Sequence, residues 1–92
     1  LAPEGRDFPD AVLGPSPSGL GRFVARLAPA CQVILPAGVF EEGEHLCVHF
    51  GTPYRLDLPT GLSPDALDRH ISQVVMRAIA RLVPEHLRGE YA

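Results

Sequence analysis

The chain has 92 residues, 46% of them hydrophobic, which is enough for one small domain with a modest core. A formal net charge of −3, with 8 basic and 11 acidic residues and no Lys/Arg cluster, argues against binding to a nucleic-acid backbone. Two cysteines are too few for a disulfide framework and indicate reduced thiols in a cytoplasmic protein.

The first six residues form an apolar run that ends in a turn with two charged side chains. Pro3 lacks a ladder donor and Gly5 tolerates positive φ, so together they permit a sharp exit from a strand. Glu4 can orient a hydroxyl group, and Arg6 can bind a phosphate in bidentate fashion. Taken alone, this block is more simply an ordinary surface turn, because short motifs match by chance. A ligand-binding turn at the carboxyl end of a buried strand is the alternative, which the order of the later motifs favours.

The Pro/Gly-rich loop that follows leads to a predicted helix over residues 19–28. Ser16 or Ser18 is its predicted N-cap. Gly19 and Gly21 weaken the helix but allow it to approach another backbone closely. Its apolar positions follow the i, i+3, i+4, i+7 spacing of a single stripe: Leu20, Phe23, Val24 and Leu27.

Residues 31–36 form a nearly continuous apolar run, which is typical of a parallel strand covered on both faces. A polar turn at residues 41–44 then separates residues 39–40 from a strand at residues 45–50, and this pattern predicts a β-hairpin. In the second strand an apolar face alternates with a face that we expect to lie in water. The apolar face carries Leu46, Val48 and Phe50, and the other carries His45, Cys47 and His49.

The three residues of this second face, together with Cys31, suggest a zinc site as an alternative. Structural zinc ligands usually come in closely spaced pairs that converge on one point, and this arrangement lacks such pairs. We therefore predict no metal site.

The last large element is a predicted helix that ends near Leu82, before Pro84. Ser63 is its N-cap, Pro64 its first residue and Asp65 a favourable charge in its first turn. Its predicted core face consists of Leu67, Ile71, Val74, Val75, Ala78, Ile79 and Leu82. The elements together predict a small α/β fragment of α+β-like composition, with a central parallel-type strand, a β-hairpin and two packed helices.

Pro3-Glu4-Gly5-Arg6 resembles the Pro-Glu-Gly-Arg phosphate-binding motif of the glycerolipid acyltransferases, the 1-acylglycerol-3-phosphate acyltransferase family. Later parts are similar to that family in the same order: a Val-Pro-type strand at residues 33–36, a Gly-x-Pro turn at residues 51–53, an amphipathic helix, and a Pro-x-x-x-Arg-Gly-x-Tyr-Ala ending at residues 84–92. The resemblance covers nearly the whole chain. It implies that residues 1–92 are a single domain, the C-terminal portion of an acyltransferase domain.

The resemblance also implies an activity. Enzymes of this family transfer a fatty acyl group from acyl-CoA or acyl-carrier protein to a hydroxyl group of a lysophospholipid or glycerol phosphate, and no cofactor is implied. By resemblance, Pro3, Glu4, Gly5 and Arg6 would bind the phosphate end of the acceptor. The residues expected to line the acceptor pocket are Val33, Leu35 and Pro36.

The chain departs from the family at the catalytic motif, His-x-x-x-x-Asp, whose His acts as general base. Five residues after its four histidines stand Phe50, Tyr54, Val75 and Tyr91, so none has the required Asp. We therefore expect no catalytic residue in this chain. Because it also lacks an initiating Met, we expect the general base upstream of Leu1 and an inactive fragment.

A non-catalytic protein-binding or regulatory module is the alternative function. The longest apolar stretch is far shorter than the roughly 20 residues of a spanning helix. The predicted location is therefore cytoplasmic, with the inner face of the membrane reached through the absent N-terminal part. A central strand that lacks its neighbours would expose a pairing edge, and this predicts a homo-oligomer.

Overall fold

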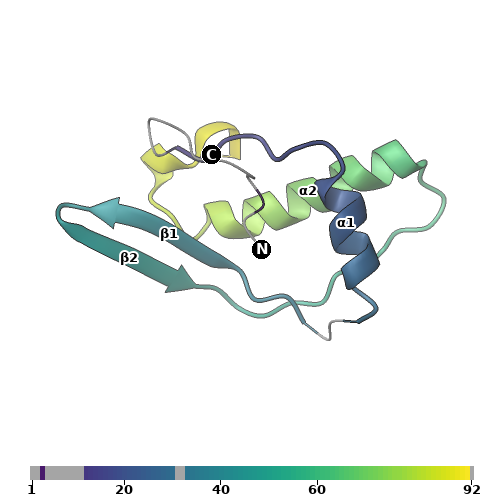
Figure 1. The fold of residues 1–92 in the computed structure, drawn as a ribbon, viewed down its shortest axis with the longest axis horizontal. Helices are drawn as coiled ribbons and strands as arrows, with labels where there is room; N and C mark the ends of the chain where they lie inside the picture. Colours follow the sequence, from purple (N-terminus) through teal and green to yellow (C-terminus); the bar gives the residue numbers. More distant parts are fainter. Residues whose placement is uncertain (1–2, 4–11, 31–32, 92) are drawn as a thin grey trace.

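The computed structural model describes residues 3, 12–30 and 33–91, and in them two helices, a β-hairpin and two short C-terminal turns (Figure 1). The elements follow the order α1 (Leu20–Leu27), β1 (Ala37–Glu42), β2 (His45–Phe50), α2 (Pro64–Ala80), η1 (Glu85–Leu87) and η2 (Gly89–Tyr91). The predicted mixed class, with one hairpin and two packed helices, is confirmed at this level. The molecule is elongated, 45 × 24 × 19 Å, with the hairpin at one end and α1 toward the other.

The contact between α1 and α2 forms the centre of the core. Gly21 allows this contact, because a Cβ at that position would overlap the backbone carbonyl of Asp68 on α2. The predicted close approach of the glycine-bearing helix is thereby confirmed. The core consists of Leu20, Val24, Ile71 and Val75, surrounded by Ile34, Leu56, Leu67 and Ile79.

The N-terminus of α1 is capped by a side chain of α2 and not by a residue that precedes α1 in the sequence. Its N-cap residue is Gly19, in the left-handed region at φ 93°. The carboxylate of Asp68 accepts hydrogen bonds from the backbone N–H groups of Gly19 and Arg22, both at 3.0 Å. The prediction of Ser16 or Ser18 as the cap is wrong, because a residue far along the chain satisfies these donors instead.

Helix α2 begins as predicted. The Oγ of Ser63 accepts a hydrogen bond from the N–H of Ala66 at 3.2 Å, and Pro64 is the first helical residue. The helix ends slightly earlier than predicted, with Arg81 as C-cap. Because α2 also contacts β1 and η2, its buried surface is wider than the predicted stripe and includes Met76 and Ala80.

The hairpin has a two-residue turn at Gly43 and Glu44, with Gly43 at φ 62°. Strand β2 agrees with prediction, whereas β1 is longer than the predicted pair of residues. The register pairs Gly38 with His49 and Phe40 with Cys47. On this face His45 and His49 of β2 are exposed, as predicted, and Cys47 is half-buried. The β1 residues of the same face are packed: Phe40 is buried, and Gly38 lies against Leu82.

The predicted central parallel-type strand is not seen. Residues 33–36 run antiparallel beside residues 51–54 and form one isolated bridge, in which Ile34 and Tyr54 exchange N–H···O bonds of 2.7 and 2.9 Å. No parallel pairing occurs within residues 12–30 and 33–91. The apolar run that predicted a strand covered on both faces leaves Val33 and Leu35 about half exposed. Cys31 and Gln32 lie outside the described residues.

The helices are short in relation to a lipid bilayer. In the described part of the chain, neither α1 nor α2 has the length and hydropathy of a membrane-spanning helix.

Candidate functional site

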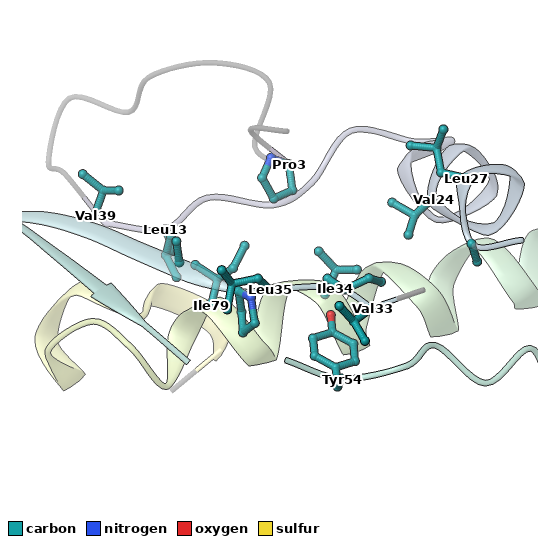
Figure 2. Close-up of a pocket in the computed structure, with 14 residues that line it drawn as sticks. Pro3, Leu13, Val24, Leu27, Val33, Ile34, Leu35, Val39, Tyr54 and Ile79 are labelled. Atoms are coloured by element: carbon teal, nitrogen blue, oxygen red, sulfur yellow. The ribbon is translucent and has the colours of Figure 1, made fainter. Parts of the chain in front are cut away.

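An apolar pocket of about 600 Å³ lies between α1, α2 and the extended segment of residues 33–39 (Figure 2). Figure 2 shows Val24 and Leu27 of α1 on one side and Pro3 and Leu13 of the N-terminal segment on another. The described residues that line it are Pro3, Leu13, Val24, Leu27, Ala28, Val33, Ile34, Leu35, Pro36, Ala37, Val39, Tyr54, Val75 and Ile79.

Backbone hydrogen bonds hold in place the extended segment of residues 33–36, which forms one wall of this pocket. The Ile34–Tyr54 bridge fixes one point, and the N–H of Gly51 donates to the carbonyl oxygen of Pro36 at 2.9 Å. Pro36 has no N–H of its own, so regular pairing stops there and the segment is free to bend toward β1. The pocket wall is therefore an extended backbone that is anchored at both ends.

The chemistry of the lining is that of a hydrocarbon site. Among the described lining residues every side chain is aliphatic or proline except Tyr54, whose phenol is the one polar side chain of that set. Burial raises the pKa of Tyr54, so its hydroxyl stays neutral and available as a hydrogen-bond donor near neutral pH. The pocket thus suits an alkyl chain with one hydrogen-bond acceptor, and none of its described residues is a general base.

The structure brings four predicted site residues to this pocket. Pro3, Val33, Leu35 and Pro36 all line it, although Pro3 is thirty positions before Val33. Their role in substrate binding stays a prediction. The other predicted phosphate-binding residues, Glu4, Gly5 and Arg6, lie outside the described residues.

Sequence reasoning missed several residues of the wall. Val24 and Leu27 belong to a helical stripe that was assigned to the core, and one side of that stripe turns out to face the pocket. Tyr54 follows the Gly51-Thr52-Pro53 turn. The one sequence feature that could have indicated its place in the pocket is an aromatic residue close to the end of a strand. Leu13 lies in a loop without a periodic pattern, so nothing in its local sequence indicates the contact.

A second hollow, the polar groove, has a volume of about 680 Å³ and shares Pro36 and Tyr54 with the apolar pocket. One wall is a row of α2 side chains at intervals of three to four residues: His70, Gln73, Arg77 and Arg81. No carboxylate lines it. The groove therefore presents two permanent cations, one on each of the last two residues of this row.

The imidazole and thiol groups of the hairpin do not form a metal centre. In the described ranges, 12–30 and 33–91, no three His, Cys, Asp or Glu side chains are placed to hold a metal ion. The ring of His49 instead packs edge-on against Phe40, with ring centroids 5.0 Å apart at 84°. This contact is structural, because edge-to-face aromatic pairs stabilise packing.

Comparison with known proteins gives no relative for this chain. No protein-family model, no curated protein and no solved structure matches it.

Proposed function

We propose that this chain is the C-terminal part of a phospholipid or glycerol acyltransferase. The complete enzyme transfers a fatty acyl group from acyl-CoA or acyl-carrier protein to the hydroxyl group of a lysophospholipid or glycerol phosphate. In the complete enzyme, residues 33–36 become a central strand with parallel neighbours from the upstream half. The enzyme works at the cytoplasmic face of the membrane, which it reaches through that half.

One observation carries the proposal. Pro3 and the residues 33–36, which the family resemblance singled out separately as substrate-binding, line the same apolar pocket. A glycerolipid has an alkyl chain beside a polar, phosphorylated end, and this pocket offers apolar walls with Pro3, next to Glu4 and Arg6 in sequence, at one side. The geometry supports an acceptor whose chain contacts Val33, Leu35 and Pro36.

The division of chemical roles follows from the residue types. Arg6 neutralises the acceptor phosphate, Glu4 orients the acceptor, and Gly5 allows the backbone to turn tightly around it. The hydroxyl oxygen attacks the thioester carbonyl carbon, the C–S bond breaks, and the sulfur leaves as a thiolate that takes up the proton removed from the hydroxyl. The hydroxyl proton first goes to a histidine of the upstream half. The 92 residues alone bind the acceptor and catalyse no transfer.

Binding of a short-chain lysophosphatidic acid, compared with the monoacylglycerol of the same chain length, tests the proposal on this chain. Arg6→Gln should weaken binding of the phosphorylated ligand about tenfold and leave the monoacylglycerol unaffected, since a charged hydrogen bond is lost only with the former. Leu35→Asp should weaken both ligands at least about tenfold, because it places a carboxylate in the apolar wall. Titration calorimetry measures each affinity.

The matched control is Leu62→Asp, an exposed leucine that lines neither hollow, and it should bind both ligands as the wild type does. The activity itself is tested on a protein extended by its natural upstream sequence, with acyl-CoA and acyl-carrier protein as donors. Absence of acyl transfer to any lysophospholipid or to glycerol phosphate overturns the enzyme assignment. Equal lipid binding by the wild type and Leu35→Asp overturns the pocket assignment.

A second candidate function is a non-catalytic protein-binding module. The observation that favours it is the exposed apolar face of the hairpin, where Leu46 and Phe50 are 68% and 67% exposed. In that case the hairpin and α2 would recognise a protein, and the upstream sequence would carry no His-x-x-x-x-Asp motif. Reading the residues encoded before Leu1 separates the two candidates.

A further inference from the structure

The hairpin presents its apolar residues outward. We define the outer face as Val39, Leu46, Val48 and Phe50, which are 56, 68, 47 and 67% exposed. Val39 pairs directly with Val48, and Leu46 and Phe50 lie two residues to either side of Val48, so all four side chains share one face of the two strands. Exposed apolar residues that adjoin one another mark interaction sites, whereas scattered ones do not.

The outer face cannot be buried by turning the hairpin over. The opposite face carries the buried Phe40 and the close contact between Gly38 and Leu82. The two-residue turn with Gly43 at positive φ fixes the register, and a slip of one residue would exchange the two faces. The exposure is thus a property of the hairpin's packing, and no element among residues 12–30 and 33–91 covers this face.

The apolar surface continues beyond the hairpin. Exposure alternates along residues 33–40, with Val33 and Leu35 about half exposed on the same side as Val39. These two residues and the outer face expose on the order of 600 Å² of side-chain surface. Two such surfaces facing each other bury about 1,200 Å², which is the lower limit of specific, stable interfaces.

Charge on the hairpin argues against a polyanionic occupant and is compatible with a second copy. Residues 37–50 carry three carboxylates, all near the turn at Glu41, Glu42 and Glu44, and no Lys or Arg. An anionic membrane surface or a nucleic acid would be repelled by this end. A second copy avoids repulsion if the hairpins lie antiparallel, since each acidic turn then faces the uncharged base of the other hairpin.

We propose that the outer face binds the same face of a second copy, forming a two-fold symmetric dimer with antiparallel hairpins. Such an isologous interface pairs each residue with its complement across the axis. Val48 lies near the centre of the outer face and hence near the axis. Val33, Leu35 and Val39 of this surface also line the apolar pocket. The dimer is therefore tested at Leu46 and Val48, which line neither hollow, so its failure is distinguishable from failure of the acyltransferase assignment.

Light scattering coupled to size-exclusion chromatography tests the dimer. The wild type should have a mass near twice 9.9 kDa at micromolar to millimolar concentration. Val48→Glu and Leu46→Lys should each raise the dimer dissociation constant at least about tenfold, with circular dichroism spectra unchanged. The matched control is Leu58→Glu, on an exposed leucine outside this surface, and it should remain dimeric. Raising the NaCl concentration from about 0.1 M to about 1 M should not weaken the dimer, because salt screens charge and not apolar contact.

Disulfide trapping tests the arrangement. In a Cys31→Ser/Cys47→Ser background, Val48→Cys should form an intermolecular disulfide, whereas Glu44→Cys at the turn should not. A wild type that is monomeric at all these concentrations overturns the proposal, as does a Val48→Glu variant that dimerises like the wild type. Cross-linking through Glu44→Cys overturns the antiparallel arrangement. A longer protein that is monomeric with this face protected from hydrogen exchange would show that upstream sequence, and not a second copy, is the occupant.

Discussion

At the scale of single residues, Gly21 permits the close packing of the two helices. Its missing side chain allows the backbones of α1 and α2 to meet, with the Asp68 carbonyl where a Cβ would stand. Helix propensity favours alanine over glycine by about 1 kcal/mol, so an uncrowded glycine would gain stability on substitution. At Gly21 the steric clash outweighs this gain, because an added methyl group would meet the backbone of Asp68, which cannot move aside as a flexible side chain could.

We expect Gly21→Ala to lower the free energy of unfolding by about 1–3 kcal/mol, because inserting a methyl group forces the helices apart. Urea denaturation followed by circular dichroism measures the change. Arg26→Ala, on the exposed side of the same helix, is the control and should change stability by no more than about 0.5 kcal/mol. A Gly21→Ala variant more stable than the wild type would contradict the packing described for α1 and α2.

At the scale of elements, α1 depends on α2 for its N-terminal cap. Partial desolvation alone would raise the pKa of Asp68, but hydrogen bonds from the backbone of Gly19, Arg22 and Gly21, with the charge of Arg22, lower it below the ordinary value of 3.8. A carboxyl group with a lowered folded-state pKa contributes stability above its unfolded pKa. That contribution is lost as pH falls through the folded pKa.

Asp68→Ala should therefore lower the free energy of unfolding by about 1 kcal/mol at pH 7, the usual effect of losing a cap. The difference from the wild type should shrink below pH 3.8, where the wild-type carboxyl itself becomes protonated. Thermal unfolding from pH 7 to pH 2.5 measures this trend. Asp57→Ala, at an exposed acidic residue of the connecting segment, is the control and should change the free energy of unfolding at pH 7 by no more than about 0.5 kcal/mol.

Local signals predicted the elements well, and contacts between elements poorly. Ser63 and Pro64 predict the start of α2 because the signal for a helix start lies within four residues. The hairpin is predicted by the alternation of apolar and polar residues beside a polar turn. The cap of α1 comes from 46 to 49 residues away, so no local pattern could reveal it. The outward face of the hairpin depends on which side meets Leu82. For the candidate site, residues 33–36 and Pro3 could be named in advance, whereas Tyr54 and Leu13 join the pocket only through chain folding.

At the scale of the whole molecule, more of the large hydrophobic side chains that the structure describes are exposed than buried. Among the described residues, eight hydrophobic side chains are buried, and the large exposed ones are more numerous: Phe23, Leu27, Val33, Leu35, Val39, Leu46, Val48, Phe50, Leu58 and Leu62. Small domains gain little stability from so small a core. Both proposals assign part of this surface to a contact, with a lipid at the pocket and with a second copy at the hairpin.

The capping of α1 by Asp68 has a consequence for the order of folding. A helix of eight residues with a glycine inside is too short to persist alone in water, and its cap exists only once α2 is in place. We expect α1 to dock after the folding transition state. Val24→Ala should then accelerate unfolding and leave the folding rate nearly unchanged, whereas Ala78→Gly in α2 should slow folding. Stopped-flow measurement of both rates checks this order, and a Val24→Ala variant that folds markedly more slowly would contradict it. The wall of the apolar pocket that α1 provides would then be the last part of the molecule to form and the first to open.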